Sequence, residues 1–187
     1  MTQATTRRRL LDAARALATE GGYDAVSMRA VAQRAGVSAP TAYQYFASRD
    51  HVLVDVLVDL AAGATALFAA RPSRRREPVE RTVATLRRVM QLFEEEPQLF
   101  VALFRAYISG APEVRHARVA MESTMRSWID SALGSTAVAE RETVVSILEA
   151  VLFTGLAGMV IGGTSPRDIG DALERAVRLL LGPPSGA

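Results

Sequence analysis

The sequence contains no cysteine and no lysine, and only two histidines occur among its 187 residues. The absence of cysteine excludes a disulfide framework, a thiolate nucleophile and a metal site with cysteine ligands. The sequence also lacks a serine–histidine–aspartate pattern, a cluster of metal ligands and a glycine-rich phosphate loop. We therefore expect a protein that is not an enzyme and that has no catalytic residue, no metal and no cofactor.

The 22 basic residues are all arginine, and they are unevenly placed along the chain. Residues 1–50 contain seven arginines against four acidic residues, whereas the remainder contains fifteen arginines against sixteen acidic residues. A basic first third attached to a nearly neutral body indicates where a polyanion would bind.

Two segments have some features of an export or membrane signal but do not complete either pattern. Asp12, Arg15 and Glu20 interrupt the apolar run that an export signal would need near the N-terminus. The uncharged run at residues 150–163 is fourteen residues long, which is too short to span a bilayer, so we expect a buried or interface helix there. Since cysteine is also absent, we expect a cytoplasmic protein with no membrane partner.

Apolar residues recur at three- and four-residue spacing through most of the chain, and glycines and prolines separate the segments. This pattern predicts an all-α fold of about nine helices with no strand. The expected helices cover approximately residues 5–19, 27–35, 38–46, 49–70, 78–95, 97–109, 112–133, 138–162 and 166–181. The three short helices predict an N-terminal domain at residues 1–47, followed by a larger helical domain at residues 48–187.

Residues 27–46 have the pattern of a helix-turn-helix unit. Ser27 and Ser38 each precede a short helix and are good N-caps, and Gly36 supplies the bend of the turn between them. The expected buried face consists of Met28, Val31, Ala32, Ala35, Ala42 and Phe46.

The other face of the helix at residues 38–46 carries polar side chains suited to DNA. The N-terminal part of such a recognition helix enters the major groove, where the Gln44 amide can pair with adenine. Arg49 has the reach to hold a phosphate, and the arginines at residues 7–9 are further phosphate candidates. The candidate DNA-contacting residues are Arg29, Ser38, Ala39, Pro40, Thr41, Tyr43, Gln44, Tyr45 and Arg49. The alternative is a helical hairpin with a solvated face, which fits each residue singly but not the combination.

Residues 10–53 resemble the N-terminal domain of the TetR family of transcriptional regulators. The resemblance rests on Gly22-Tyr23, the segment from Ser27 through Ala35, Gly36-Val37-Ser38, Thr41-Ala42-Tyr43, Tyr45-Phe46, Ser48-Arg49-Asp50 and Leu53. The family's usual leucine, histidine and lysine are replaced by Ala42, Tyr45 and Arg49. The resemblance implies that Tyr45 and Arg49 bind phosphates, and that the bases are contacted, with help from Arg29, by Ala39, Pro40, Thr41, Tyr43 and Gln44.

Large, adaptable apolar residues in the later helices are candidates for core or for a ligand pocket. A cavity between bundle helices is a usual site for a small molecule, methionine suits irregular cavities, and the resemblance implies an effector site. We expect an apolar or amphipathic effector, with Arg105, Tyr107 or Trp128 as its polar contacts. The candidate ligand-binding residues are Met90, Phe93, Phe104, Tyr107, Met125, Trp128 and Phe153, and core packing is the alternative for each.

The last two expected helices carry apolar and small residues that suit a homodimer interface. Two such faces from each subunit would form a four-helix bundle. The predicted interface residues are Leu148, Val151, Leu152, Gly155, Gly158, Gly162, Ile169, Ala172, Leu173, Ala176, Val177 and Leu180. The alternative is that these faces bury only against their own chain.

The hypothesis from the sequence is a dimeric, ligand-responsive DNA-binding transcriptional regulator, specifically a repressor released from a palindromic operator by a small effector. A dimer would engage two half-sites together. Helix 49–70 would carry the two reading heads, the domains at residues 1–47, since it begins where that domain ends and continues into the larger domain. The alternative is an all-α sensor or carrier whose N-terminal helices dock a protein, and salt-insensitive behaviour towards DNA would favour it.

Overall fold

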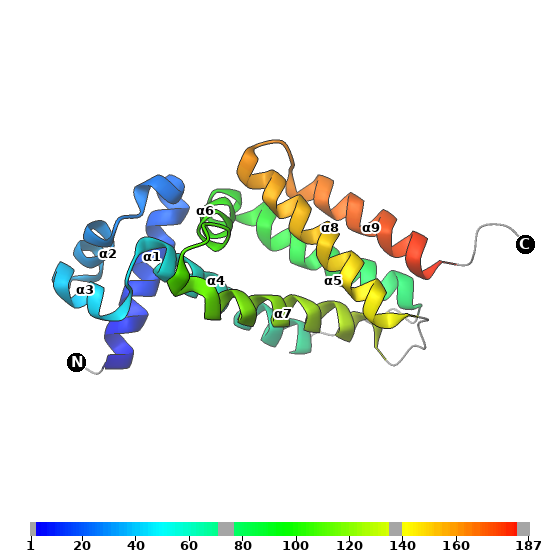
Figure 1. Cartoon of the computed structure of the whole chain (residues 1–187), viewed down its shortest axis with the longest axis horizontal. Helices are drawn as coiled ribbons and strands as arrows, with labels where there is room; N and C mark the ends of the chain where they lie inside the picture. The colour runs from blue at the N-terminus through cyan, green and yellow to red at the C-terminus, as the bar shows by residue number, and fades with distance from the viewer. Residues whose placement is uncertain (1–2, 71–76, 135–139, 183–187) are drawn as a thin grey trace, which may run out of the picture. The chain divides into compact units, whose positions relative to one another are not determined.

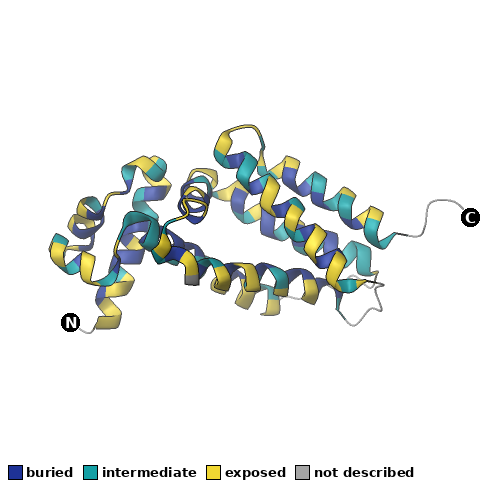
Figure 2. Ribbon diagram, in the orientation of Figure 1, coloured by how far each residue is buried: buried dark blue, intermediate teal, exposed yellow. Residues whose placement is uncertain are grey.

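The computed structural model describes residues 3–70, 77–134 and 140–182. Every regular element in those ranges is helical, which confirms the predicted all-α fold, and each helix has buried and exposed faces (Figure 2). The elements (Figure 1) are α1 (Gln3–Ala25), α2 (Met28–Ala35), α3 (Ala39–Tyr45), α4 (Arg49–Ala70), α5 (Pro78–Glu95), α6 (Pro97–Tyr107), the 3₁₀ turn η1 (Pro112–Val114), α7 (Arg115–Leu133), α8 (Arg141–Ile161) and α9 (Pro166–Leu181). The expected start of a helix at residue 138 lies outside the described residues.

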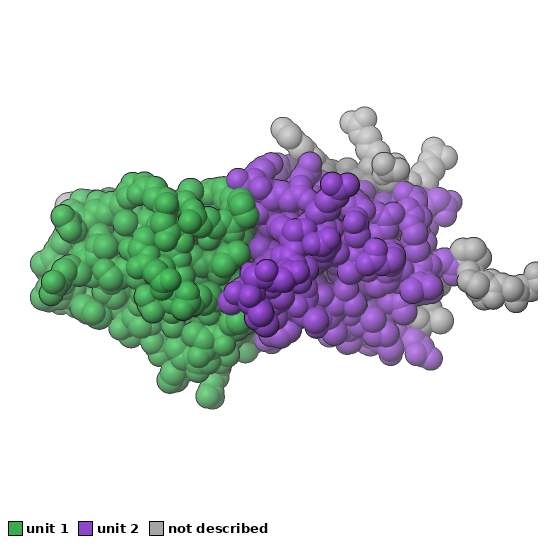
Figure 3. All heavy atoms as spheres, turned by 90° about the horizontal axis from the view of Figure 1, so that it is seen from above, with its two compact units in different colours: residues 1–61, 96–121 green, residues 62–95, 122–187 purple. Residues whose placement is uncertain are grey.

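The chain divides into two compact units that do not follow chain order (Figure 3). Unit 1 contains residues 1–61 and 96–121, and unit 2 contains residues 62–95 and 122–187. Unit 1 therefore joins α1 to α3 with the beginning of α4, with α6 and with the beginning of α7. The boundary between residues 47 and 48 is a functional division, and it stays a prediction.

In unit 1, α1 packs against both α2 and α6. Non-helical backbone at Gly21 and Gly22 interrupts α1, where the sequence predicts its end, and Gly22 has a φ of 66° that favours glycine. The carboxylate of Glu96, at the start of α6, accepts hydrogen bonds from Arg15 at 2.7 Å and from Thr19 at 3.1 Å. Glu96 therefore fixes the start of α6 against α1.

Two of the described helices, α4 and α8, are long and apolar enough to cross a membrane by length and composition alone. In α4, however, Asp55 and Asp59 form ion pairs with Arg7 and Arg8 of α1. Charged pairs of this kind, midway along a helix, are typical of a helix packed in a water-soluble bundle. In unit 2, α8 packs against α9, as expected for a buried or interface helix.

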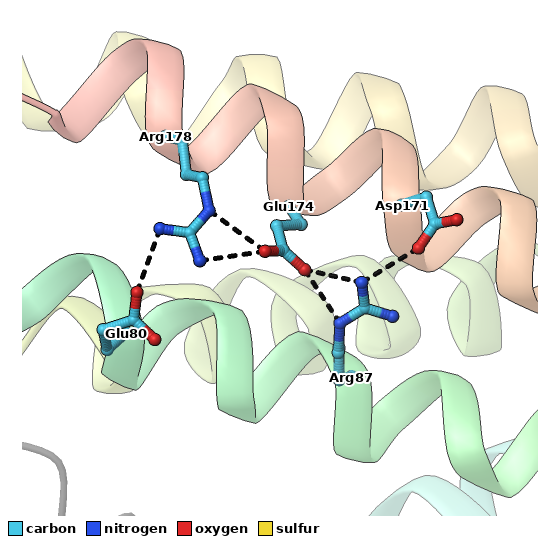
Figure 4. A network of polar contacts seen from close by, with 5 residues as sticks. All are labelled: Glu80, Arg87, Asp171, Glu174 and Arg178. Carbon is cyan, nitrogen blue, oxygen red and sulfur yellow. Dashed lines mark hydrogen bonds and ion pairs between the residues drawn. The ribbon is translucent and has the colours of Figure 1, made fainter.

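A polar network joins α5 to α9 in unit 2 (Figure 4). The guanidinium of Arg87 donates hydrogen bonds to Glu174 and Asp171, and that of Arg178 donates to Glu174 and Glu80. Hydrogen bonds from Arg87 and then from Arg178 hold the pKa of the Glu174 carboxyl below its ordinary value. Exposed ion pairs add little stability singly, so the network serves mainly to fix the register of the two helices.

The contact between α8 and α9 is close because α8 has glycine at the crossing. A Cβ atom added to Gly155 would lie 2.8 Å from Cγ1 of Ile169, a side chain that is buried and cannot move aside. Several residues predicted for the dimer interface are buried within the chain itself, namely Leu148, Leu152, Ile169, Leu173 and Val177. For these five, the structure corrects the prediction in favour of packing against their own chain.

A different part of the α8 and α9 surface remains apolar and exposed. The exposed side chains are Ile147, Phe153 and Ile161 of α8 and Leu179 of α9. Ile161 and Leu179 are 84% and 82% exposed, more than any other large apolar side chain among the described residues.

We expect Gly155→Ala to destabilise the protein, because the added methyl group has no space beside Ile169. Overpacking of this kind costs about 1–3 kcal/mol, and thermal unfolding followed by circular dichroism should show the lower Tm. The matched control is Gly63→Ala in α4, where an added Cβ meets no atom within 4 Å. That substitution should raise the Tm slightly, since alanine is the better helix former. Equal Tm changes in the two variants would contradict the close α8–α9 contact.

Candidate nucleic-acid interface and effector site

The turn between α2 and α3 is built by local hydrogen bonds that the sequence predicts. The Oγ atom of Ser27 accepts a hydrogen bond from the Ala30 N–H at 3.1 Å and caps the start of α2. Gly36 ends α2 in the left-handed conformation, with φ of 64° and ψ of 40°, and its N–H donates back to Ala32 and Gln33. A left-handed residue at this position directs the chain into α3.

The start of α3 is fixed by Ser38. Its Oγ atom accepts a hydrogen bond from the Thr41 N–H at 3.2 Å, and the two hydroxyl groups lie 2.8 Å apart in a second hydrogen bond. An N-cap of this type contributes about 1 kcal/mol. Thr41, a predicted reader of bases, therefore also helps to complete the cap.

The remaining surface of α3 faces outward, as Figure 2 shows. Ala42 is buried within the helix, and Phe46 is buried directly after it. Pro40, Tyr43 and Gln44 are exposed, with Tyr43 at 56%. Among the other candidates, Arg29 and Ser38 are exposed and the half-buried ones are Ala39, Thr41, Tyr45 and Arg49. The division between buried and outward residues that the sequence predicts is therefore present.

Carboxylates neutralise several arginines of unit 1. Arg34 of α2 donates two hydrogen bonds to Glu20 of α1, and these lower the pKa of the Glu20 carboxyl. Arg7 and Arg8 pair with acidic residues of α4. The predicted phosphate contacts at residues 7 and 8 therefore have charged partners within the chain.

Arg29 and Arg49 differ from these arginines, because neither forms an ion pair with any residue that the structure describes. Both were predicted from the sequence to contact DNA. The guanidinium carbon of Arg49 lies 4.0 Å from the centroid of the Tyr23 ring. An arginine held over an aromatic ring keeps its full positive charge, and its donors remain available to an anion.

The candidate ligand-binding residues are divided between the two units. Phe104 and Tyr107 of α6 are buried in unit 1, where their rings stack with centroids 5.2 Å apart. The buried candidates of unit 2 are Met90 and Phe93 of α5 and Met125 and Trp128 of α7. Phe153 of α8 is 44% exposed and so belongs to the exposed apolar surface of that helix.

Trp128 already has a polar partner. Its indole N–H donates a hydrogen bond to Oγ1 of Thr65 at 2.7 Å, and its ring meets Phe68 edge-on at 5.6 Å between centroids. A ligand could use this N–H only by replacing Thr65. Arg105, another expected polar contact of the effector, lies instead over Tyr23 in unit 1, with its guanidinium carbon 4.3 Å from the ring centroid.

Sequence reasoning missed the part that Tyr23 plays beside Arg49. In the sequence, Gly22-Tyr23 contributes only to the family resemblance. No sequence spacing relates Tyr23 to Arg49 and Arg105, since the three residues come from three different helices. An aromatic residue directly after a helix-ending glycine pair, in a basic domain, is the one signal that was available.

Comparison with known proteins identifies the class of protein. Residues 10–56 match the family described as bacterial regulatory proteins, tetR family, and residues 76–180 match the tetracyclin repressor-like C-terminal domain. The second match alone covers more than half of the chain. The protein therefore belongs to the TetR family of transcriptional regulators, as its sequence resemblance implied, and it is not an enzyme.

The similarity to individual proteins extends over nearly the whole chain. The chain is 33% identical over 184 residues to the HTH-type transcriptional repressor KstR of Rhodococcus jostii, covering 96% of this chain and 84% of that protein. A TetR transcriptional regulator from a Rhodococcus species has a TM-score of 0.81 at 27% identity, covering 98% and 99% of the two chains. Thermus thermophilus FadR, solved with lauroyl-CoA, has the same fold, with a TM-score of 0.69 at 22% identity and 97% and 99% coverage.

We expect Arg49→Ala to weaken binding to any DNA duplex, because it removes a phosphate contact that is independent of sequence. The slope of log affinity against log salt concentration should fall by about 0.9 for each subunit on the DNA. Fluorescence anisotropy at several salt concentrations measures it. Arg34→Ala is the matched control: it changes the net charge equally, but Arg34 is already paired with Glu20. An equal loss of slope in both variants would contradict the assignment of Arg49.

Proposed function

We propose that the protein is a dimeric repressor that binds a palindromic operator and leaves it when a small amphipathic effector binds the helical body. The observation that carries this proposal is the outward surface of α3, together with Arg29 and Arg49, which have no carboxylate partner among the described residues, in a chain of the TetR family. A regulator that acts on chromosomal DNA works in the cytoplasm, and a sequence without cysteine fits that reducing compartment.

Within this proposal, the residues of the reading head have separate tasks. Gln44 reads base edges, and the exposed Tyr43 and Pro40 make further contacts in the major groove. Arg49 and Tyr45 hold phosphates and so set the register of α3 on the duplex, whereas Arg29 reaches a guanine or a phosphate. The supporting observations are the exposure of α3 and the absence of carboxylate partners for the two arginines among the described residues.

The dimer in this proposal uses the exposed apolar side chains of α8 and α9 rather than the buried ones. Ile147 and Ile161 of α8 and Leu179 of α9 are exposed in the single chain. Exposed apolar side chains on two helices that pack together are candidates for an association surface. A second copy of the chain would cover them and would place two reading heads on two half-sites of a palindrome.

The effector in this proposal has an apolar chain and a polar head group. Thermus thermophilus FadR was solved with lauroyl-CoA and Bacillus subtilis FadR with stearoyl-CoA, and both share the fold of this chain. The apolar chain would lie among the candidate residues of unit 2, which are Met90, Phe93, Met125 and Trp128. Flexible methionine side chains can adapt to such a ligand. To act as a switch, the effector must bind the DNA-free state more tightly than the DNA-bound state.

We expect footprinting of the DNA upstream of the protein's own gene to show a protected palindrome that added lauroyl-CoA releases, whereas free coenzyme A does not. Trp128 is the only tryptophan in the chain, so binding in unit 2 should also change the intrinsic fluorescence.

Gln44→Ala should retain affinity for unrelated DNA but lose preference for the palindrome. Salt-insensitive behaviour towards every duplex would instead favour a protein-docking module.

We expect the double variant Ile161→Arg, Leu179→Arg to be monomeric, because a dimer would bury two unpaired charges for each subunit. Sedimentation velocity measures the change in mass, and circular dichroism checks that the helices remain. The control is Val119→Arg on α7, which replaces another exposed apolar side chain, 61% exposed, in unit 1. If the control dissociated the dimer and the double variant did not, the proposed interface would be wrong.

A further inference from the structure

Tyr23 is the point at which three helices of unit 1 meet. It lies in the last turn of α1, beyond the break at Gly21 and Gly22, and its side chain is partly buried. Arg49 reaches its ring from the first turn of α4, and Arg105 reaches it from the last turn of α6. The two guanidinium carbons lie 4.0 Å and 4.3 Å from the ring centroid, which is well within the range of a cation–π contact.

One carboxylate fixes the orientation of the ring, and a second one holds Arg105 beside it. The Tyr23 hydroxyl donates a 2.6 Å hydrogen bond to Oδ1 of Asp50, next to Arg49 in sequence. Arg105 donates to Asp24 at 3.5 Å, so the second cation is held beside α1. Burial, followed by the hydrogen bond to Asp50, raises the pKa of the Tyr23 hydroxyl, which therefore remains a neutral donor at physiological pH.

These contacts give Arg49 an aromatic partner in place of a carboxylate. A guanidinium paired with a carboxylate would lose much of its attraction for a phosphate, as expected for Arg34 with Glu20. An unsupported arginine side chain would instead lose conformational entropy on binding, which weakens the contact. The ring of Tyr23 orients the guanidinium without neutralising it.

We propose that Tyr23 is a positioning residue for DNA binding: its ring holds the Arg49 guanidinium ready for a phosphate, and Arg105 of α6 braces the same ring. The proposal deepens the proposed function and rests on it, since it assumes that Arg49 binds DNA. It also gives α6 a direct link to the phosphate contact, because a shift of Arg105 acts on the ring that orients Arg49.

The test compares Tyr23→Leu, which removes the ring, with Tyr23→Phe, which keeps it. Anisotropy titrations of a labelled duplex against the full chain, at several salt concentrations, give affinity and salt slope for each. Tyr23→Leu should bind the duplex roughly 3–10-fold more weakly than the wild type. Tyr23→Phe should bind more tightly than Tyr23→Leu, because it keeps the ring for the cation–π contact and loses only the hydrogen bond to Asp50.

The double variant Tyr23→Leu, Arg49→Ala separates positioning from general damage to the fold. If the ring acts through Arg49, the double variant should bind no more weakly than Arg49→Ala alone. Arg105→Ala should weaken binding less than Tyr23→Leu, and its effect should disappear when Tyr23 is leucine. Thermal unfolding of each variant shows any loss of stability, which by itself would leave the salt slope unchanged.

The outcomes distinguish this proposal from the function on which it rests. A wild-type protein that binds no duplex would overturn both. If the wild type binds and Arg49→Ala lowers the salt slope, but Tyr23→Leu retains full affinity, only the role of Tyr23 is wrong. Additive losses for Tyr23→Leu and Arg49→Ala would also overturn it, because they would show that the two residues act independently.

Discussion

The pairing of arginines with carboxylates is the constraint on which the proposed DNA surface depends. Every cation in the chain apart from histidine is an arginine, so charge alone does not distinguish one from another. In unit 1, Arg8, Arg15 and Arg34 pair with the carboxylates of Asp59, Glu96 and Glu20, none of which belongs to the same helix as its arginine. Arg29 and Arg49 have no such partner among the described residues. Because several arginines of the first fifty residues are paired with carboxylates, a polyanion would bind mainly through the few that are not.

Contacts made by arginines also join the N-terminal helices to α6 within unit 1. Glu96 joins the start of α6 to α1 through Arg15 and Thr19, and Arg105 joins its end to Tyr23. The chain passes between the two units within α4, between α5 and α6, and within α7. The sequence suggested α4 alone as the connection between reading head and effector domain. The structure adds two further connections between the units. The helix that follows one of them, α6, contacts Tyr23 through Arg105, and the ring of Tyr23 also lies against Arg49.

Much of the fold follows from local patterns in the sequence. The caps at Ser27 and Ser38, the left-handed Gly36 and most helix boundaries were predictable, because each depends on residues within one or two turns. The side chains of α8 and α9 that remain exposed were not. An apolar stripe shows that a face is buried but not which neighbour buries it, and Gly155 lies against Ile169 of the same chain.

The sequence by itself determined an all-α chain with a helix-turn-helix unit and an outward polar face on α3, because helix periodicity, capping and turn geometry are interactions between near neighbours. Only the tertiary structure decided which arginines have no carboxylate partner among the described residues, which aromatic ring lies against Arg49 and which apolar side chains stay exposed. These depend on pairs such as Arg15 with Glu96 and Tyr23 with Arg49, which are far apart in the chain. No periodicity relates such residues, since only the packing of one helix against another brings them together.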